Sequence, residues 1–354
     1  MATSLITEIP VFVFSSQLRE IEFSTDLDKV IITLEYGTTE IFRTTLYAYN
    51  GNVTLINIAE VIEDYMTKND LVFTAFTMYY NNADGTNLGS FNLNTQYCSL
   101  NLNINTGLFG SYNFLTTLTA KRVPRNAIDY IWLLHGQDSG EVKAHCVYEQ
   151  ENGEVANKTV TMRRLITDDL GVTQIIINQS QLLMLLRSGG ASVSKLLSFA
   201  IEFNNRYFTY YVTDKEVDVS FVFKNCFNVD EIAYFNAITT TTTKVNRSTA
   251  VVGGRHLFYD QSVDKTYEVE SAPLTSDEAY WVEQLLMSHS VRLNDSSLHD
   301  VIITDSTCEI SDNDEQLNKV KFTWQFAMKT PHLMKSFRED TNGIFTEPYN
   351  QTFN

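Results

Sequence analysis

The chain has 354 residues, of which 44% are hydrophobic and 19% charged. It is long enough for about two domains with their own cores, and its composition excludes a disordered, charge-driven protein. Its 43 acidic and 26 basic residues give a net charge of −17, which disfavours binding to nucleic-acid phosphates or to an anionic membrane surface. The four cysteines have neither metal-ligand nor redox spacing, so a disulfide framework is not expected.

Strand signals dominate the first hundred residues. Alternating or β-branched runs predict strands over Val11–Ser15, Glu20–Ser24, Val30–Tyr36, Glu40–Tyr47, Leu71–Tyr80 and Leu100–Ile104. Asn50-Gly51 is the strongest two-residue hairpin signal in the chain. Asn57 and Glu60 have the spacing of a capping box, and an apolar stripe as far as Met66 predicts a helix after them.

The middle of the chain is less clear in two places. The apolar residues between Pro124 and His135 fit either a short helix or a strand, and Gln181–Arg187 fits a short helix or the end of a strand. Strands are predicted over His145–Glu149, Lys158–Leu165, Leu196–Phe203 and Tyr207–Thr213. A boundary between two modules is expected at about residue 210.

The second half repeats the order of strand, turn, capped helix and strand. Strands are predicted over Val217–Phe223, Thr239–Thr243, Lys265–Glu270, Val291–Leu293, Val301–Thr304 and Val320–Lys329. Two further capping boxes, Asn228 with Glu231 and Thr275 with Glu278, predict helices that end near residues 238 and 288.

These patterns predict a mainly β fold with two β-sandwich-like modules, each carrying one or two short helices between strands. The N-terminal module is expected over residues 1–210 and the C-terminal module, with its capped helices, over residues 211–330. Residues 331–354 lose the strand period and gain Asn, Thr and Glu. They are therefore expected to form an extended C-terminal arm.

No pattern of catalytic chemistry stands out. The chain has no glycine-rich phosphate loop and no hydrolase or zinc-protease motif, and its six histidines are isolated. We therefore expect no enzyme activity, no catalytic residue, no cofactor and no metal. Asp312 and Asp314 resemble part of a calcium loop, but the glycine and distal glutamate of an EF-hand are missing, which favours a solvated hairpin turn. Gly253-Gly254 is likewise read as a hairpin turn.

Three aromatic residues have two readings. Tyr280, Trp281 and Trp324 could form a stacking platform for a sugar. Trp324, however, lies in an alternating strand in which Val320 and Phe322 share its face, and this pattern favours a core position.

Two parts of the chain carry a resemblance to a known group of proteins. The first is Ile31–Met66, and the second comprises Ala279–Leu286, Val301–Thr307 and Val320–Ala327. Together they resemble virion structural proteins of tailed bacteriophages that infect gut Bacteroidetes, the crAss-like phages included. The resemblance implies an assembly role in a tail, collar or baseplate ring, and it carries over no catalytic residue.

The function expected from this resemblance is that of a non-enzymatic virion structural protein. It would build a homo-oligomeric ring or an adaptor in a phage tail, neck or baseplate, in contact with other virion proteins and without direct nucleic-acid or membrane binding. The alternative is a carbohydrate- or receptor-binding β-sandwich module on a virion. Met1–Glu8 lacks the basic and apolar regions of a secretory signal, which predicts a protein made in the host bacterial cytoplasm and incorporated into the virion.

The predicted arm contains the candidate assembly contacts. Its aromatic residues are expected to reach a neighbouring subunit, as closed heterologous contacts do in rings. They are Phe337, Phe345, Tyr349 and Phe353. Deleting the residues after Pro331 should weaken assembly and leave the monomer folded.

Overall fold

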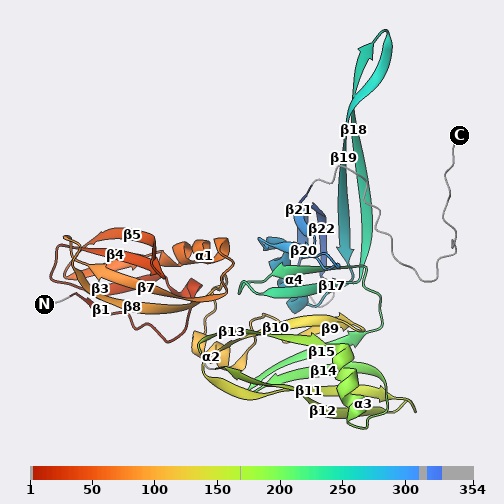
Figure 1. The fold of residues 1–354 in the computed structure, drawn as a ribbon, viewed down its shortest axis with the longest axis horizontal. Coiled ribbons are helices and arrows are strands. Elements are labelled where there is room, and N and C mark those ends of the chain that lie inside the picture. The colour runs from red at the N-terminus through yellow and green to blue at the C-terminus, as the bar shows by residue number, and fades with distance from the viewer. Residues whose placement is uncertain (1–2, 168, 311–316, 329–354) are drawn as a thin grey trace.

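The computed structural model describes residues 3–167, 169–310 and 317–328 (Figure 1). The fold is mainly β, with several sheets and short helices between strands, as the sequence predicted. The sheets follow one another along the chain in three groups, which we call the N-terminal unit (3–104), the central unit (105–216) and the C-terminal unit (217–328).

The N-terminal unit is a sandwich of two sheets. Its strands are β1 (Ser4–Leu5), β2 (Val13–Phe14), β3 (Glu20–Ser24), β4 (Lys29–Tyr36), β5 (Thr39–Tyr47), β6 (Asn52–Ile56), β7 (Phe73–Asn81) and β8 (Asn87–Gln96). They form a five-stranded sheet, β2-β8-β7-β4-β5, and a three-stranded sheet, β1-β3-β6. The inner faces meet in a core that includes Phe23, Ile32 and Phe76, to which helix α1 (Ile58–Lys68) adds Ile62. Alternation along each strand therefore separates a buried face from an exposed one.

The central unit pairs a five-stranded sheet with a two-stranded one. Its elements are α2 (Thr106–Tyr112), β9 (Ala120–Pro124), β10 (Ile128–His135), β11 (Asp138–Gln150), β12 (Val155–Thr167), β13 (Gly171–Asn178), α3 (Gln179–Ser188), β14 (Val193–Phe203) and β15 (Arg206–Thr213). The sheet orders are β12-β11-β14-β15-β9 and β10-β13. Helix α3 contributes Leu182 and Leu186 to the core that the two sheets share.

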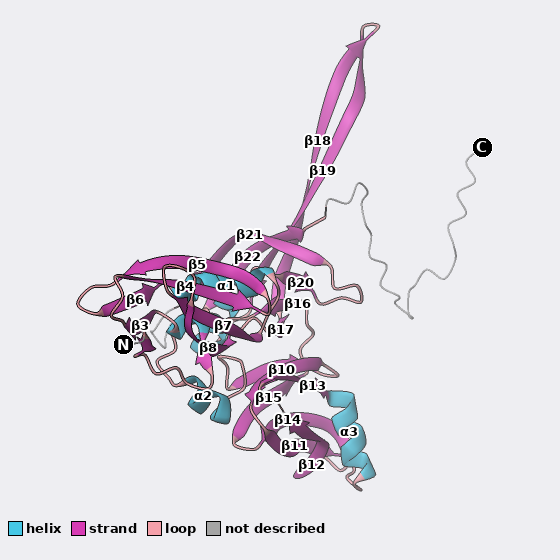
Figure 2. Ribbon diagram, turned by 60° about the vertical axis from the view of Figure 1, so that its left-hand side comes forward, coloured by secondary structure: helices cyan, strands magenta, loops and turns pink. Residues whose placement is uncertain are grey.

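The C-terminal unit is one seven-stranded sheet with one helix. Its elements are β16 (Val219–Lys224), β17 (Asp230–Phe235), β18 (Ala237–Val252), β19 (Arg255–Ser271), α4 (Ser276–Met287), β20 (Val291–Leu293), β21 (Asp300–Glu309) and β22 (Lys319–Phe326). The strand order is β17-β16-β20-β21-β22-β19-β18. Helix α4 packs on this sheet through Trp281, Val282 and Leu285, and β18 and β19 extend far beyond it (Figures 1 and 2).

The three units are joined by shared cores. The core of the central unit is continuous with that of the C-terminal unit. A smaller cluster brings Phe14 of the N-terminal unit against Phe109 of the central unit and Phe227 of the C-terminal unit, with ring centroids 5.4–5.9 Å apart. These contacts hold the units against one another through buried apolar side chains.

Several sequence predictions are confirmed. The predicted hairpin of Val30–Tyr36 and Glu40–Tyr47 is formed by β4 and β5, and the turn at Asn50-Gly51 has positive φ at both residues. The two ambiguous segments are settled as strand β10 and helix α3. Helix α2 was not predicted, because its seven residues include two glycines and lack an apolar stripe.

The helix predicted after Asn228 is wrong. Residues 230–235 form strand β17, which pairs with β16 along its whole length. Asn228 has φ +59°, a turn conformation that asparagine tolerates. The capping-box spacing of Asn228 and Glu231 is therefore coincidental, because Asn228 is a turn residue and Glu231 lies in a strand.

Two other local predictions also need correction. Helix α1 begins where predicted, but Asn57 has φ +59° and its side chain makes no capping hydrogen bond. Leu100–Ile104, predicted as a strand, pairs with no strand. Its carbonyl groups instead accept side-chain donors: Gln17 Nε2 donates to the carbonyls of residues 102 and 104 at 3.2 and 2.6 Å.

The predicted module 1–210 contains two groups of sheets with separate cores. The predicted boundary near residue 210 lies at the end of β15, where the central unit gives way to the C-terminal unit. The division of the chain into modules 1–210 and 211–330 stays a prediction, and the arm at 331–354 lies outside the described residues.

Candidate functional site

The most prominent feature of the molecule is the hairpin of β18 and β19, which projects from the C-terminal unit (Figures 1 and 2). Its two strands have 16 and 17 residues and pair antiparallel from Ala237–Ser271 to Val252–Arg255. Gly253 and Gly254 close it with φ +61° and +76°, the conformation that a tight two-residue hairpin turn requires. The predicted turn at these glycines is thus confirmed.

The base of the hairpin is firmly attached to the sheet. Strand β19 pairs with β22 over Tyr267–Glu270. The Tyr267 ring stacks on Trp324 with centroids 4.2 Å apart, and Val269 is fully buried. On the exposed side of the base, Lys321 Nζ lies 2.9 Å from Glu268 Oε1. The projection therefore starts from a rigid platform.

The rest of the hairpin has no such support. Among the described residues β18 pairs with β19 alone. Between the turn and Tyr267, β19 likewise pairs only with β18. Val251 and Leu257, near the tip of the hairpin, are 63% and 51% exposed. An isolated two-stranded ribbon is marginally stable in water, and an open strand edge is a template for pairing with another chain. Both properties are typical of a segment that is completed by a partner.

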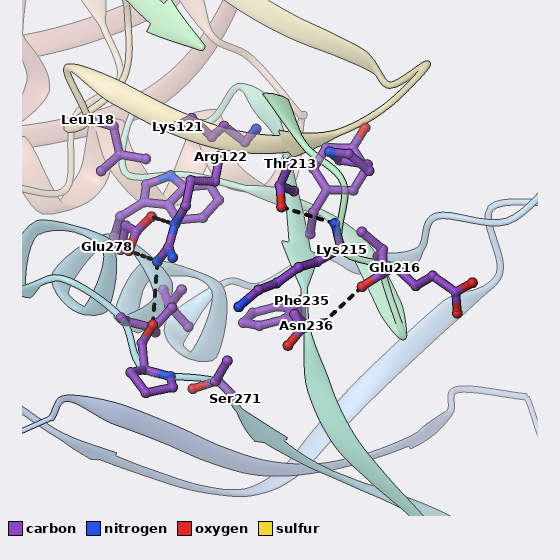
Figure 3. A pocket seen from close by; sticks show the side chains of 18 residues that line it. Leu118, Lys121, Arg122, Thr213, Lys215, Glu216, Phe235, Asn236, Ser271 and Glu278 are labelled. Atoms are coloured by element: carbon purple, nitrogen blue, oxygen red, sulfur yellow. Dashed lines mark hydrogen bonds and ion pairs between the residues drawn. The ribbon is translucent and has the colours of Figure 1, made fainter. Parts of the chain in front are cut away.

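A pocket lies between the central and C-terminal units, where β9 and the end of β15 face β17 and α4 (Figure 3). Arg122 crosses one side of it and forms an ion pair with Glu278. Lys215 lies across the pocket with Phe235 beside it (Figure 3). The cavity measures about 90 Å³, well below the roughly 300–1,000 Å³ of ordinary small-molecule sites.

Three buried charges lie near this pocket. Lys121 Nζ is 2.6 Å from Asp129 Oδ2, and both side chains are almost completely buried. Glu231, also buried, accepts hydrogen bonds from Asn225 Nδ2 at 2.6 Å and from Trp281 Nε1. Burial raises the pKa of Asp129 and of Glu231, and the positive charge of Lys121 opposes that rise for both.

This cluster connects two units. Lys121 and Asp129 belong to the central unit, whereas Glu231 and its two hydrogen-bond donors belong to the C-terminal unit. Its polar atoms are satisfied by one another and are shielded from solvent, so the arrangement suits the alignment of two units better than reaction with a substrate. The sequence pattern assigned Glu231 to a capping box, and no pattern connected it with Lys121 or Asp129, since their spacing in the chain corresponds to no known motif.

The residues that the sequence singled out are distributed as follows. Trp324 is in the core, as predicted, and Trp281 is 5% exposed, whereas Tyr280 is 53% exposed. These three side chains therefore form no shared exposed platform for a sugar. The calcium candidates Asp312 and Asp314 lie outside the described residues, as do the four aromatic contacts of the predicted arm: Phe337, Phe345, Tyr349 and Phe353.

The described residues contain neither a metal-binding cluster nor a membrane-spanning helix. No group of three or more His, Cys, Asp or Glu residues there is arranged to hold a metal ion. No helix in that part of the chain is long and apolar enough to cross a membrane. The hairpin remains the feature with the clearest functional geometry, and its two ends were visible in the sequence as a threonine run and a Gly-Gly turn.

Comparisons with known proteins give little guidance. No family model and no curated protein matches the chain. Among solved structures, the extracellular region of plexin A4 is 10% identical, with a TM-score of 0.22 over 94% of this chain and 40% of that one. An E. coli alpha-2-macroglobulin is 7% identical, with a TM-score of 0.22 over 76% of this chain and 21% of that one. A tetra-tandem repeat of a large adhesion protein is 10% identical, with a TM-score of 0.20 over 76% of this chain and 69% of that one. The chain thus spans less than half the length of the first two.

Proposed function

We propose that this protein is a non-enzymatic structural protein of a phage virion, which assembles into a ring or adaptor of the tail, neck or baseplate through protein–protein contacts. The observation that carries the proposal is the β18–β19 hairpin. Among the described residues, the outer edge of β18 pairs with no other strand, and towards the tip the hairpin exposes apolar side chains such as Val251 and Leu257. A segment of this kind gains most of its stabilisation from a neighbouring subunit.

The rest of the molecule suits the same role. Shared apolar cores connect the three units, so a force applied through the hairpin would be transmitted to the whole body. The pocket between the central and C-terminal units is too small for a sugar chain or a sizeable ligand. Two other hollows, of about 360 and 310 Å³, lie beside residues 101–105 and between Asp70 and Arg292, so the proposal rests on the hairpin and not on pocket size. The resemblance of Ile31–Met66 to phage virion proteins agrees with it.

Native mass at several concentrations tests the proposal. The full chain should form a discrete oligomer, or grow towards one as its concentration rises. In a shortened variant, Asn-Gly replaces residues 243–265 between Thr242 and Thr266, which are paired in the hairpin. This variant should remain folded, because the removed part is mostly exposed, but it should no longer assemble.

The matched control shortens a different hairpin. Asn-Gly replaces residues 150–154 between Glu149 and Val155, which are paired next to the exposed turn of β11 and β12. This control should assemble like the unchanged protein. A full chain that stays monomeric at every concentration, or a shortened β18–β19 variant that assembles normally, would contradict the proposal.

A further inference from the structure

The outer edge of β18 differs in charge from the rest of the chain. Residues 236–259, which contain β18 and the turn, include Lys244, Arg247 and Arg255 and no acidic residue, in a protein of net charge −17. Asp260 and Asp264 follow on the return strand, so the distal hairpin from Lys244 to Asp264 has a net charge of +1 and the remaining chain −18. The free edge of the hairpin is thus a basic strand on an acidic molecule.

The three units do not share the acidic charge equally. The central unit has 11 acidic and 11 basic residues, whereas the N-terminal unit has 12 acidic and 4 basic residues. The C-terminal unit has 17 acidic and 8 basic residues. A basic edge should therefore approach the N-terminal or the C-terminal unit of another copy in preference to the central one, since long-range charge steers the encounter of two surfaces.

One face of the N-terminal unit has the matching charge. Residues 20–28 contain four acidic residues and no basic one. On β3, Glu20 and Glu22 alternate with buried residues, so both lie on the outer face of the sheet β1-β3-β6. Ile56 on β6 is paired directly with Glu20 and is 60% exposed. We call the outer side of β1-β3-β6, together with the exposed Asp28 in the connection from β3 to β4, the acidic face. It offers carboxylates to the basic side chains of the hairpin and an apolar side chain to its apolar ones.

The hairpin and the acidic face cannot meet within one molecule. The acidic face lies at one end of the body, and the hairpin projects from the far side of the C-terminal unit, in both views (Figures 1 and 2). A contact between them must join two copies of the chain through different surfaces. Such head-to-tail contacts produce rings when the rotation between subunits closes and filaments when it does not.

We propose that the β18–β19 hairpin of one copy docks on the acidic face of the next copy, with Lys244, Arg247 and Arg255 placed against Glu20, Glu22 and Asp28. This inference rests on the proposed assembly function and names the surface that receives the hairpin. The contact orients the subunits head to tail, so that every copy both donates a hairpin and receives one.

A charge exchange between two variants tests this contact. Variant H carries Lys244→Glu, Arg247→Glu and Arg255→Glu, and variant F carries Glu20→Lys, Glu22→Lys and Asp28→Lys. In either variant alone the two surfaces have the same sign, so the concentration at half-assembly should rise by about tenfold or more. In an equal mixture each hairpin finds an oppositely charged face on the other variant, and assembly should return with H and F alternating.

A control keeps the total charge change of variant H and moves it to the central unit. It carries Arg163→Glu, Arg164→Glu and Lys215→Glu, three exposed positions, and should assemble like the unchanged protein. The inference is overturned if H and F assemble normally, or if both are folded by circular dichroism and their mixture fails to assemble. If the shortened hairpin abolishes assembly while H and F do not, the assembly function stands and the acidic face is the wrong surface. A monomeric full chain overturns both.

Discussion

Lys121, Asp129 and Glu231 show how single residues hold this protein together. All three are ionisable side chains buried in the interior, and a buried charge is tolerated only when it is paired and hydrogen-bonded. Lys121 neutralises Asp129 directly at 2.6 Å and lies 5.3 Å above the ring of Trp281, which in turn donates to Glu231. The orientation of the central unit against the C-terminal unit thus depends on a few specific atoms.

Removing Lys121 should be costly. Lys121→Met leaves Asp129 buried without its partner, and we expect a loss of about 3–5 kcal/mol in the free energy of unfolding, measured in urea. Lys68→Met is the matched control. Lys68 pairs with Asp64 on the surface of α1, where both side chains are more than half exposed, so its loss should cost less than about 1 kcal/mol. Equal effects of the two substitutions would contradict this account of the buried pair.

Glu278 should make stability depend on pH. Burial alone would raise the pKa of Glu278, but hydrogen bonds from Arg122 and from the Thr275 backbone outweigh it and hold the pKa below its ordinary 4.5. A depressed carboxylate pKa stabilises the fold above the unfolded-state value and loses that effect as pH falls through the folded-state value. Glu278→Gln should therefore be less stable than the unchanged protein near pH 7, by about 1 kcal/mol.

The difference between the two proteins should shrink as pH falls below about 4.5, because glutamine can replace the neutral acid in a capping box. Urea unfolding at a series of pH values measures it. A difference that stays constant between pH 7 and pH 3 would show that the charge of Glu278 is not the cause.

At the scale of elements, helix starts that look alike in the sequence are built differently. The Thr275 hydroxyl accepts a hydrogen bond from the backbone N–H of Glu278, and the Glu278 carboxylate accepts one from the backbone N–H of Thr275. The predicted capping box of α4 is therefore confirmed. Asn57 has the same spacing to Glu60 but lies in the left-handed region. Its backbone N–H donates to the carbonyl of Arg19, a residue that only the tertiary fold brings close.

This contrast predicts different mutational effects. Thr275→Ala should cost about 0.5–2 kcal/mol in the free energy of unfolding, because a side-chain cap is lost. Asn57→Gly should change it by less than about 0.5 kcal/mol, since no capping bond is lost and glycine readily adopts positive φ. Thermal and urea unfolding of the two variants measure both effects. A large loss for Asn57→Gly would mean that its side chain does contribute to the start of α1.

The whole molecule combines a body joined by shared cores with one long projection. Apolar clusters connect the three units, and the charge is distributed so that the N-terminal unit is acidic while the free edge of the hairpin is basic. The proposed head-to-tail contact needs both properties, because the body fixes the angle between donor and acceptor surfaces and the charges select which surfaces meet.

Assembly through such a contact should weaken with salt. Raising ionic strength from about 0.05 to 0.5 M shortens the screening length to a few ångströms, so the concentration at half-assembly should increase. A variant that ends at residue 330 tests the predicted arm separately. If the hairpin contact dominates, this variant should assemble with the same salt dependence, as measured by light scattering. Assembly that strengthens with salt would indicate an apolar contact instead.

The sequence by itself determined the fold class, most strands of the sheets, the helix of Thr275 and the turns at Asn50-Gly51 and Gly253-Gly254. These features depend on local alternation, capping and glycine conformation, which act over a few residues. Only the tertiary structure decided that residues 230–235 form a strand and that Leu100–Ile104 does not. The first segment pairs with the preceding strand β16, and carbonyls of the second accept hydrogen bonds from Gln17, which is distant in the chain.

The candidate site divides in the same way. The Gly-Gly turn and the threonine run were visible in the sequence. The length of the hairpin and the free edge of β18 became visible only in the strand pairing of the structure. Lys121, Asp129 and Glu231 meet only because two sheets pack against each other, and no spacing along the chain encodes such packing. Local sequence determined the individual turns and strands, whereas the burial of apolar surface between units decided which side chains lie together.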